Sequence, residues 1–87
     1  MMHNTQLTLS ELKNGTHGRI IKIGGGQQAV KRLSALGIVP GKEIVKVSGM
    51  PLHGPVIVDV DRTQVALGFG LAKKVFVEVL DENFAGR

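Results

Sequence analysis

Leu36-Gly37-Ile38-Val39-Pro40-Gly41 is the most informative segment of the chain, because it joins an amphipathic segment to a valine-rich one. Gly37 stands where a helix ends on a left-handed residue, a conformation that glycine adopts without a steric penalty. Pro40 prevents the helix from resuming, and Gly41 completes a tight turn. None of these six residues carries a reactive group, so the stretch predicts architecture and no chemistry.

The segment before this stretch has the periodicity of a helix. Over residues 27–36, Val30, Leu33 and Leu36 recur at helical spacing and are expected to share the buried face, with Ala29 at its edge. About three turns are too few for an independently stable helix. The helix is therefore expected to pack on strands.

Alternation of apolar and polar residues predicts strands on both sides of the helix. They are expected over residues 18–23, 43–48, 55–60, 65–67 and 75–79. In the first of them, Ile21 and Ile23 are expected on one face and Lys22 on the other. Thr8 and Glu11 are expected to cap a single helical turn ahead of it. The prediction is a mainly β fold: a small five-stranded barrel with one inserted α-helix, because closing the sheet hides its edges.

Length and composition exclude several classes of protein. The 87 residues allow one domain, expected over residues 7–80, with flexible ends at 1–6 and 81–87. The absence of cysteine excludes disulfides and thiol chemistry. No secretory signal and no apolar run of about 20 residues is present, which predicts a cytoplasmic protein without membrane insertion. The net charge of +4 is spread along the chain with no aromatic residue between basic ones, so direct nucleic-acid binding is not expected.

The glycine run has the form of a nucleotide-binding motif in the wrong context. Gly24-Gly25-Gly26-Gln27-Gln28-Ala29 matches G-x-G-x-x-A, but the repeated parallel βα units and the later acidic residue of a dinucleotide fold are missing. A hinge between strand and helix is the preferred interpretation, and a weak anion site at the helix N-terminus is the alternative. No cofactor is expected.

Neither metal binding nor catalysis is predicted. His3, His17 and His53 lie far apart with no second ligand at helical or strand spacing, so each is expected to be a solvated side chain. Asp59 and Asp61 are read as the solvent side of a strand, with a hard-cation site as the alternative. No nucleophile–base arrangement or carboxylate pair in an apolar setting is recognisable, so the protein is not expected to be an enzyme.

One loop is the candidate for partner binding. Met50, Pro51, Leu52 and His53 form a proline-stiffened apolar segment, which loses little entropy on binding. Phe69, between two glycines, is the fifth candidate contact. The alternative is that these apolar side chains fold inward and plug the barrel end.

Read in order, these features resemble the FeoA family, the small cytoplasmic companion of the FeoB ferrous iron transporter in bacteria. The resemblance covers roughly Leu7 to Val79, and its order and spacing are more specific than any single motif. It is carried by Leu9-Ser10-Glu11-Leu12, Gly15, Ile20-Ile21-Lys22-Ile23 with the glycine run, Arg32-Leu33, the stretch 36–41, Pro51-Leu52, Gly54-Pro55-Val56, Ala66-Leu67-Gly68, Ala72 and Val75-Phe76-Val77.

The resemblance implies an SH3-like barrel and a non-enzymatic adaptor that binds the cytoplasmic GTPase region of FeoB, which would bring it to the inner face of the membrane. The same barrel occurs as the C-terminal domain of iron-dependent repressors of the diphtheria-toxin-repressor type. A metal-responsive regulatory domain is therefore the alternative function. Weak homo-oligomerisation is left open.

Overall fold

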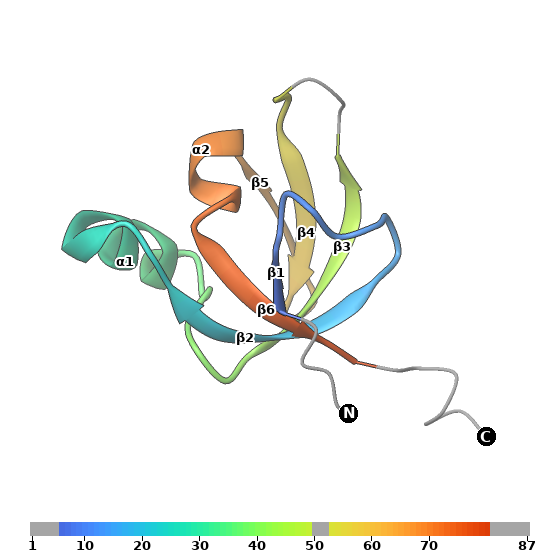
Figure 1. Cartoon of the computed structure of the whole chain (residues 1–87), viewed down its shortest axis with the longest axis horizontal. Coiled ribbons are helices and arrows are strands. Elements are labelled where there is room, and N and C mark those ends of the chain that lie inside the picture. The colour runs from blue at the N-terminus through green and yellow to red at the C-terminus, as the bar shows by residue number, and fades with distance from the viewer. Residues whose placement is uncertain (1–5, 50–52, 81–87) are drawn as a thin grey trace.

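The computed structural model describes residues 6–49 and 53–80, and within them six antiparallel strands and two short helices follow one another (Figure 1). Their bounds are β1 Gln6–Thr8, β2 His17–Ile23, α1 Gly26–Ala35, β3 Glu43–Gly49, β4 Val56–Val60, β5 Thr63–Leu67, α2 Phe69–Ala72 and β6 Val75–Val79. The strands form one sheet in the order β1-β6-β2-β3-β4-β5, which curls around the core. The expected mainly β fold with an inserted helix is confirmed.

The expected number of five strands is wrong because it omits β1. Glu11 does cap the segment: the backbone N–H of Thr8 donates to Glu11 Oε1 at 2.8 Å, and the Glu11 N–H donates to the Thr8 carbonyl at 2.9 Å. These bonds close a turn and not a helix, and the residues before it pair with β6. Gln6, expected in a flexible end, is part of this strand.

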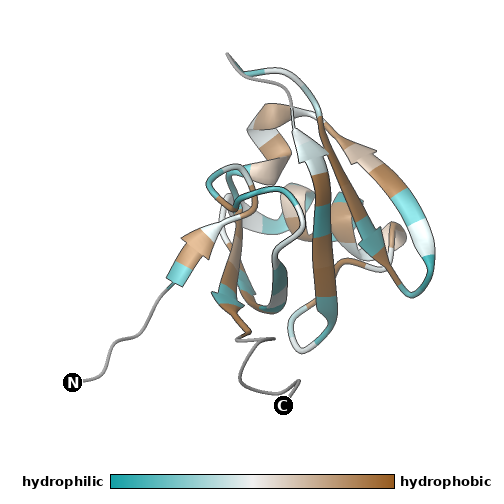
Figure 2. Ribbon diagram, turned by 90° about the vertical axis from the view of Figure 1, so that its right-hand side faces the viewer, coloured by the Kyte–Doolittle hydropathy of each residue, from teal (hydrophilic) through white to brown (hydrophobic). Residues whose placement is uncertain are grey.

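The core is aliphatic (Figure 2), and β4 and β6 contribute alternate residues to it. Its members are Leu9, Leu12, Ile20, Leu33, Ile38, Ile44, Val56, Val58, Val60, Leu67, Ala72, Val75 and Val77. The inward face expected for β4, with valine at alternate positions, is confirmed. Strands β2 and β3 occupy the centre of the sheet, and β1 and β5 form its two edges.

In β2, Ile21 and Ile23 were expected to share one face, but only Ile23 packs against the core. The register with β6 shifts between Ile20 and Lys22, which places a bulge in the strand. Ile20 is fully buried, whereas 37% of Ile21 is exposed. Ile23, beyond the bulge, packs against the core.

Helix α1 also packs on a different face from the expected one. Ala29 and Leu33 are buried, one turn apart, and they seat the helix on the barrel. Val30 and Leu36 remain 42% and 41% exposed. The apolar face that α1 buries against the barrel is therefore narrower than the helical periodicity of the sequence predicted.

The junction after α1 is built as the sequence predicts. Gly37 has a φ of 83°, its N–H donates to the Ser34 carbonyl, and the N–H of Ile38 reaches back to the Leu33 carbonyl, each at 2.9 Å. This pair of bonds is the Schellman motif, and it carries Ile38 into the core against the helix. Gly41 then donates its N–H to the Ile20 carbonyl at 2.8 Å, which ties the turn to β2.

Replacing Gly37 with Val is expected to lower the free energy of unfolding by about 1–2 kcal/mol. Nothing lies within 4 Å of the position that a Cβ would take, so the penalty comes from the left-handed backbone alone. Gly37→Asn is the matched control, because asparagine tolerates this conformation and should lose less. Urea unfolding of both variants measures the difference. Equal stability of Gly37→Val and the unmodified protein would contradict the assignment.

Candidate functional site

Helix α2 and the residue that follows it present two side chains on one face. Ala72 is buried and Leu71 packs against the core, which fixes the helix on the barrel. Phe69 and Lys73 stand four residues apart, and the Lys73 N–H donates to the Phe69 carbonyl at 3.0 Å. Helical spacing therefore brings their side chains together, and the Lys73 ammonium lies 5.6 Å from the centre of the Phe69 ring.

His53 completes this group from a different part of the chain. Its backbone adopts a left-handed conformation with a φ of 71°. Its ring stacks on that of Phe69 with 4.4 Å between centroids and 28° between planes. We call His53, Phe69 and Lys73 the His53–Phe69 cluster. It brings together two of the five residues expected to bind a partner; the other three, Met50, Pro51 and Leu52, lie outside the described residues.

The cluster has the properties of a binding surface. Phe69 is half-buried and does not belong to the core cluster, while His53 and Lys73 are exposed. A stacked aromatic pair with an ammonium group over one face offers apolar area and positive charge at the same place. Such a surface can accept an apolar side chain flanked by a carboxylate. Whether a partner uses it stays a prediction.

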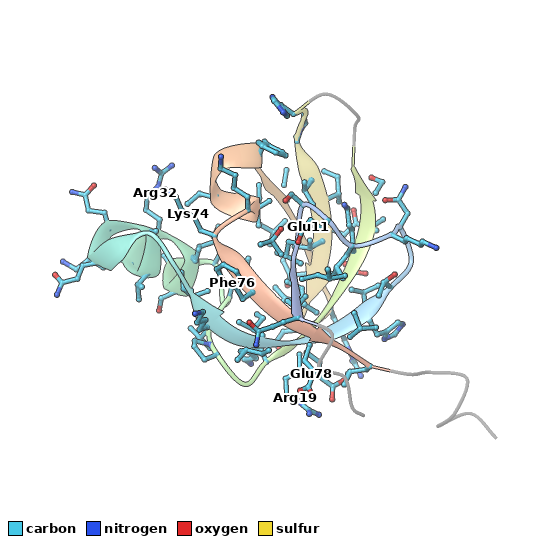
Figure 3. The ribbon with its side chains drawn as sticks, in the orientation of Figure 1. Glu11, Arg19, Arg32, Lys74, Phe76 and Glu78 are labelled. Atoms are coloured by element: carbon cyan, nitrogen blue, oxygen red, sulfur yellow. The ribbon has the colours of Figure 1, made fainter. Side chains whose placement is uncertain are left out.

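A second aromatic–cation contact lies on the ladder between β2 and β6. Lys22 and Phe76 are register partners, and the Lys22 ammonium lies 5.1 Å from the centre of the ring. Lys74 lies alongside the glycine run, since a Cβ on Gly25 would come within 2.5 Å of its side chain. Figure 3 shows Arg32 on α1 on the same side as Lys74. Sequence reasoning missed this contact because it depends on the register of two distant strands.

Lys46 is a buried lysine that sequence reasoning counted only as one of the scattered charges. It is 5% exposed, and its ammonium donates to the carbonyls of Leu12 at 2.8 Å and Ser10 at 3.2 Å. The bonds tie the turn after β1 to β3. Removal from water lowers the pKa of Lys46 below its ordinary value of 10.5. The available signal was strand alternation: Ile44 faces inward, so the residue two positions later does too.

The expected acidic and histidine positions are not brought together as a metal site. Within residues 6–49 and 53–80, no group of three or more histidine, aspartate or glutamate side chains could hold a metal ion. Asp61 lies in the turn after β4, where its carboxylate pairs with the Lys42 ammonium at 2.6 Å. Asp59 remains in the strand, so the two do not share a strand face as expected.

The glycine run opens α1 without forming a nucleotide-binding unit. Gly25 and Gly26 have φ values of 86° and 87°, and the N–H of Gly24 donates to the Lys74 carbonyl at 2.7 Å. All the strand pairings are antiparallel, whereas a dinucleotide fold needs parallel βα units. In the part of the chain that the structure describes, neither helix has the length and apolar character required to cross a bilayer.

Comparisons with known families and with known proteins point to the same family. A family model described as the FeoA domain matches residues 7–79. A protein of Methanocaldococcus jannaschii that bears the name Fe(2+) transport protein A is 33% identical over 78 residues, which is 90% of each chain. The matched residues include all the strands and both helices except for the first residue of β1.

Solved structures agree with the fold. A crystal structure of an iron uptake regulatory protein, FeoA, is 36% identical with a TM-score of 0.82, covering 87% of this chain and 100% of that one. The structure of Stenotrophomonas maltophilia FeoA complexed with zinc is 35% identical with a TM-score of 0.69, covering 82% of this chain and 88% of that one. That protein is described as a prokaryotic SH3 domain protein, so the expected SH3-like class is confirmed.

The same fold recurs inside larger regulators. A manganese-dependent transcriptional repressor has a TM-score of 0.81 at 20% identity, with 92% of this chain matching 45% of that one. At this identity the likeness concerns the fold alone.

Proposed function

The chain belongs to the FeoA family, and from that membership we propose that it is a non-enzymatic accessory protein of ferrous iron uptake that binds the cytoplasmic region of a FeoB-type transporter. The observation that carries the proposal is the extent of the match: the FeoA domain spans residues 7–79, and a solved FeoA is covered over its whole length. The proposed role is regulation of the transporter's GTP-dependent import through contact, with the reacting groups supplied by the transporter.

We place the docking surface at the His53–Phe69 cluster together with residues 50–52. The cluster lies at the end of the barrel where α2 and the start of the β4 segment meet (Figure 1). Phe69 contacts both the His53 ring and the Lys73 ammonium, so less side-chain freedom remains to be lost on binding. A restrained aromatic side chain of this kind is typical of residues that dominate binding energy.

The test is binding of the purified protein to the cytoplasmic region of the transporter, measured by calorimetry without nucleotide, with GDP and with a non-hydrolysable GTP analogue. Phe69→Ala is expected to weaken binding at least about tenfold, as for a central aromatic contact. Val30→Ala on α1 is the matched control, because this exposed valine lies away from the cluster and should leave the affinity unchanged. Thermal melts monitored by circular dichroism confirm that both variants fold.

Two outcomes would contradict the proposal at different levels. No binding in any nucleotide state, with normal Fe(II) uptake in a strain lacking the protein, would remove the adaptor function. Binding that is weakened by Val30→Ala and not by Phe69→Ala would retain the function and move the docking surface to α1.

A metal-responsive regulatory domain is the second candidate. It is favoured by the zinc complex of the Stenotrophomonas maltophilia FeoA, a protein 35% identical to this chain. Titration calorimetry with Fe(II), Mn(II) and Zn(II) distinguishes the two candidates. Metal binding at micromolar concentration with no transporter binding would favour the regulatory domain.

A further inference from the structure

Strand β5 is an edge strand of the sheet, and the backbone N–H and carbonyl groups of two of its residues point away from β4. The hairpin from β4 turns through Asp61 and Arg62, whose φ values of 53° and 65° are those of a two-residue type I′ turn. Such a turn is closed by a hydrogen-bonded pair, here Val60 opposite Thr63. Bonded and non-bonded pairs then alternate along the ladder.

It follows that the backbone groups of Gln64 and Ala66 point away from β4. Both residues are exposed. Among the backbone hydrogen bonds outside the ladders in residues 6–49 and 53–80, none involves either of them. Figure 2 shows β5 at the outer edge of the molecule with no ribbon beyond it. Two N–H groups and two carbonyls are thus presented in a row.

The two ends of the sheet are protected differently. At β1, only three residues long, the Thr8 N–H is already taken by the Glu11 carboxylate. Strand β5 is five residues long, contains no charge and no proline, and pairs with β4 without a register shift. Charges, prolines and bulges are the usual means of blocking an edge strand. An edge without them is open to another strand.

We propose that β5 pairs with β5 of a second copy of this chain, antiparallel, with Val65 opposite Val65. This register places Gln64 of each copy opposite Ala66 of the other, so all four outward backbone groups of each strand are used. The pairing is isologous, as closed dimers require. The two strands do not repel each other because neither is charged.

The residues flanking β5 fit the same register. One step beyond the strand, Arg62 of one copy lies opposite Gly68 of the other. Gly68 continues the extended backbone, with a φ of −64° and a ψ of 155°. Nothing lies within 4 Å of the position of a Cβ there, which leaves room for the arginine side chain. The occupant that matches this edge in shape and charge is therefore the same edge.

The expected dimer is weak and strengthened by salt. Two five-residue strands bury less than the roughly 1,200 Å² of a stable interface. Each copy also carries a net charge of +4, and the repulsion between the two is screened as the ionic strength rises. Binding of an acidic partner would show the opposite dependence on salt. The inference does not depend on the proposed role in iron uptake.

Sedimentation velocity from about 10 μM to about 1 mM protein, in about 50 and about 300 mM NaCl, tests the dimer. Ala66→Pro removes an outward N–H that the β4 ladder does not use, so the fold is expected to survive and the association constant to fall at least about tenfold. Ala66→Lys should act in the same direction. Ala35→Lys adds the same charge at an exposed site on α1 and should associate like the unmodified protein.

Amide spectra recorded over the same concentrations locate the contact. Concentration-dependent shifts centred on residues 64–66 are expected. A monomer at every concentration and salt would overturn the proposal, as would unchanged association of the Ala66 variants or shifts confined to another strand. Loss of folding in Ala66→Pro would also overturn it, because the N–H would then belong to the ladder with β4.

Discussion

Replacing Leu33 with Ala is expected to lower the free energy of unfolding by about 2–5 kcal/mol. Leu33 is fully buried and is the main apolar anchor of α1 on the barrel. Its carbonyl also accepts the N–H bonds of Leu36 and Ile38, so the cavity would open next to the helix cap. Guanidinium unfolding followed by circular dichroism measures the change.

Leu36→Ala is the matched control for this variant. The same chemical group is removed three residues further along the chain, from a side chain that is 41% exposed, and the loss should stay below about 1 kcal/mol. Similar losses for the two variants would mean that the helix presents to the barrel the face first expected from its periodicity. The pair therefore decides the rotation of α1 about its axis.

The helix face could not be predicted because two apolar stripes satisfy the same period. The residues Val30, Leu33 and Leu36 recur every three positions, whereas Ala29 and Leu33 are one full turn apart, and both sets lie within the spread of a 3.6-residue repeat. The choice is made by the barrel and by Ile38, which folds back beneath the helix. Helix propensity and apolar periodicity cannot predict that packing of Ile38 against the helix.

Local signals were reliable where the backbone of the segment itself decides the structure. Gly37 has the positive φ that the sequence predicted, at 83°, and Gly41, predicted to complete a tight turn, has a φ of 95°. The inward face of β4 was also correct, since a continuous ladder keeps strict alternation. In β2 the same rule failed at the bulge after Ile20, because a shift in pairing depends on the partner strand.

The sequence predicted individual residues of the candidate site, but it did not predict which of them contact one another. The sequence singled out His53 and Phe69 separately, and their contact depends on how α2 folds onto the end of the barrel. The contact of Lys22 with Phe76 had no local signal, because it exists only in the register of β2 with β6. Long-range pairing is the information that a single sequence lacks.

Lys46→Met is expected to lower the free energy of unfolding by about 1–3 kcal/mol, mainly because the buried Leu12 carbonyl is left without a donor. Gly49 leaves room for the lysine side chain, since a Cβ on Gly49 would lie 2.9 Å from Lys46 Cε and 3.2 Å from Lys46 Nζ. Lys13→Met is the matched control, since it removes the same charge from an exposed side chain and should change stability by less than about 0.5 kcal/mol. Urea unfolding of the three proteins gives the comparison.

Repeating that comparison as the pH is raised toward the ordinary lysine pKa of 10.5 distinguishes a buried cation from a merely well-packed side chain. Because burial lowers the pKa of Lys46 in the folded protein, the unfolded chain binds more protons between that lowered pKa and the ordinary value of 10.5. The free energy of unfolding therefore gains a contribution as the pH rises through this window, and the contribution disappears as the pH falls below the folded pKa. Lys46→Met lacks it, so the stability difference between the unmodified protein and the variant should widen from neutral to alkaline pH. A difference that narrows would mean that the two carbonyls stabilise the ammonium by more than its removal from water costs.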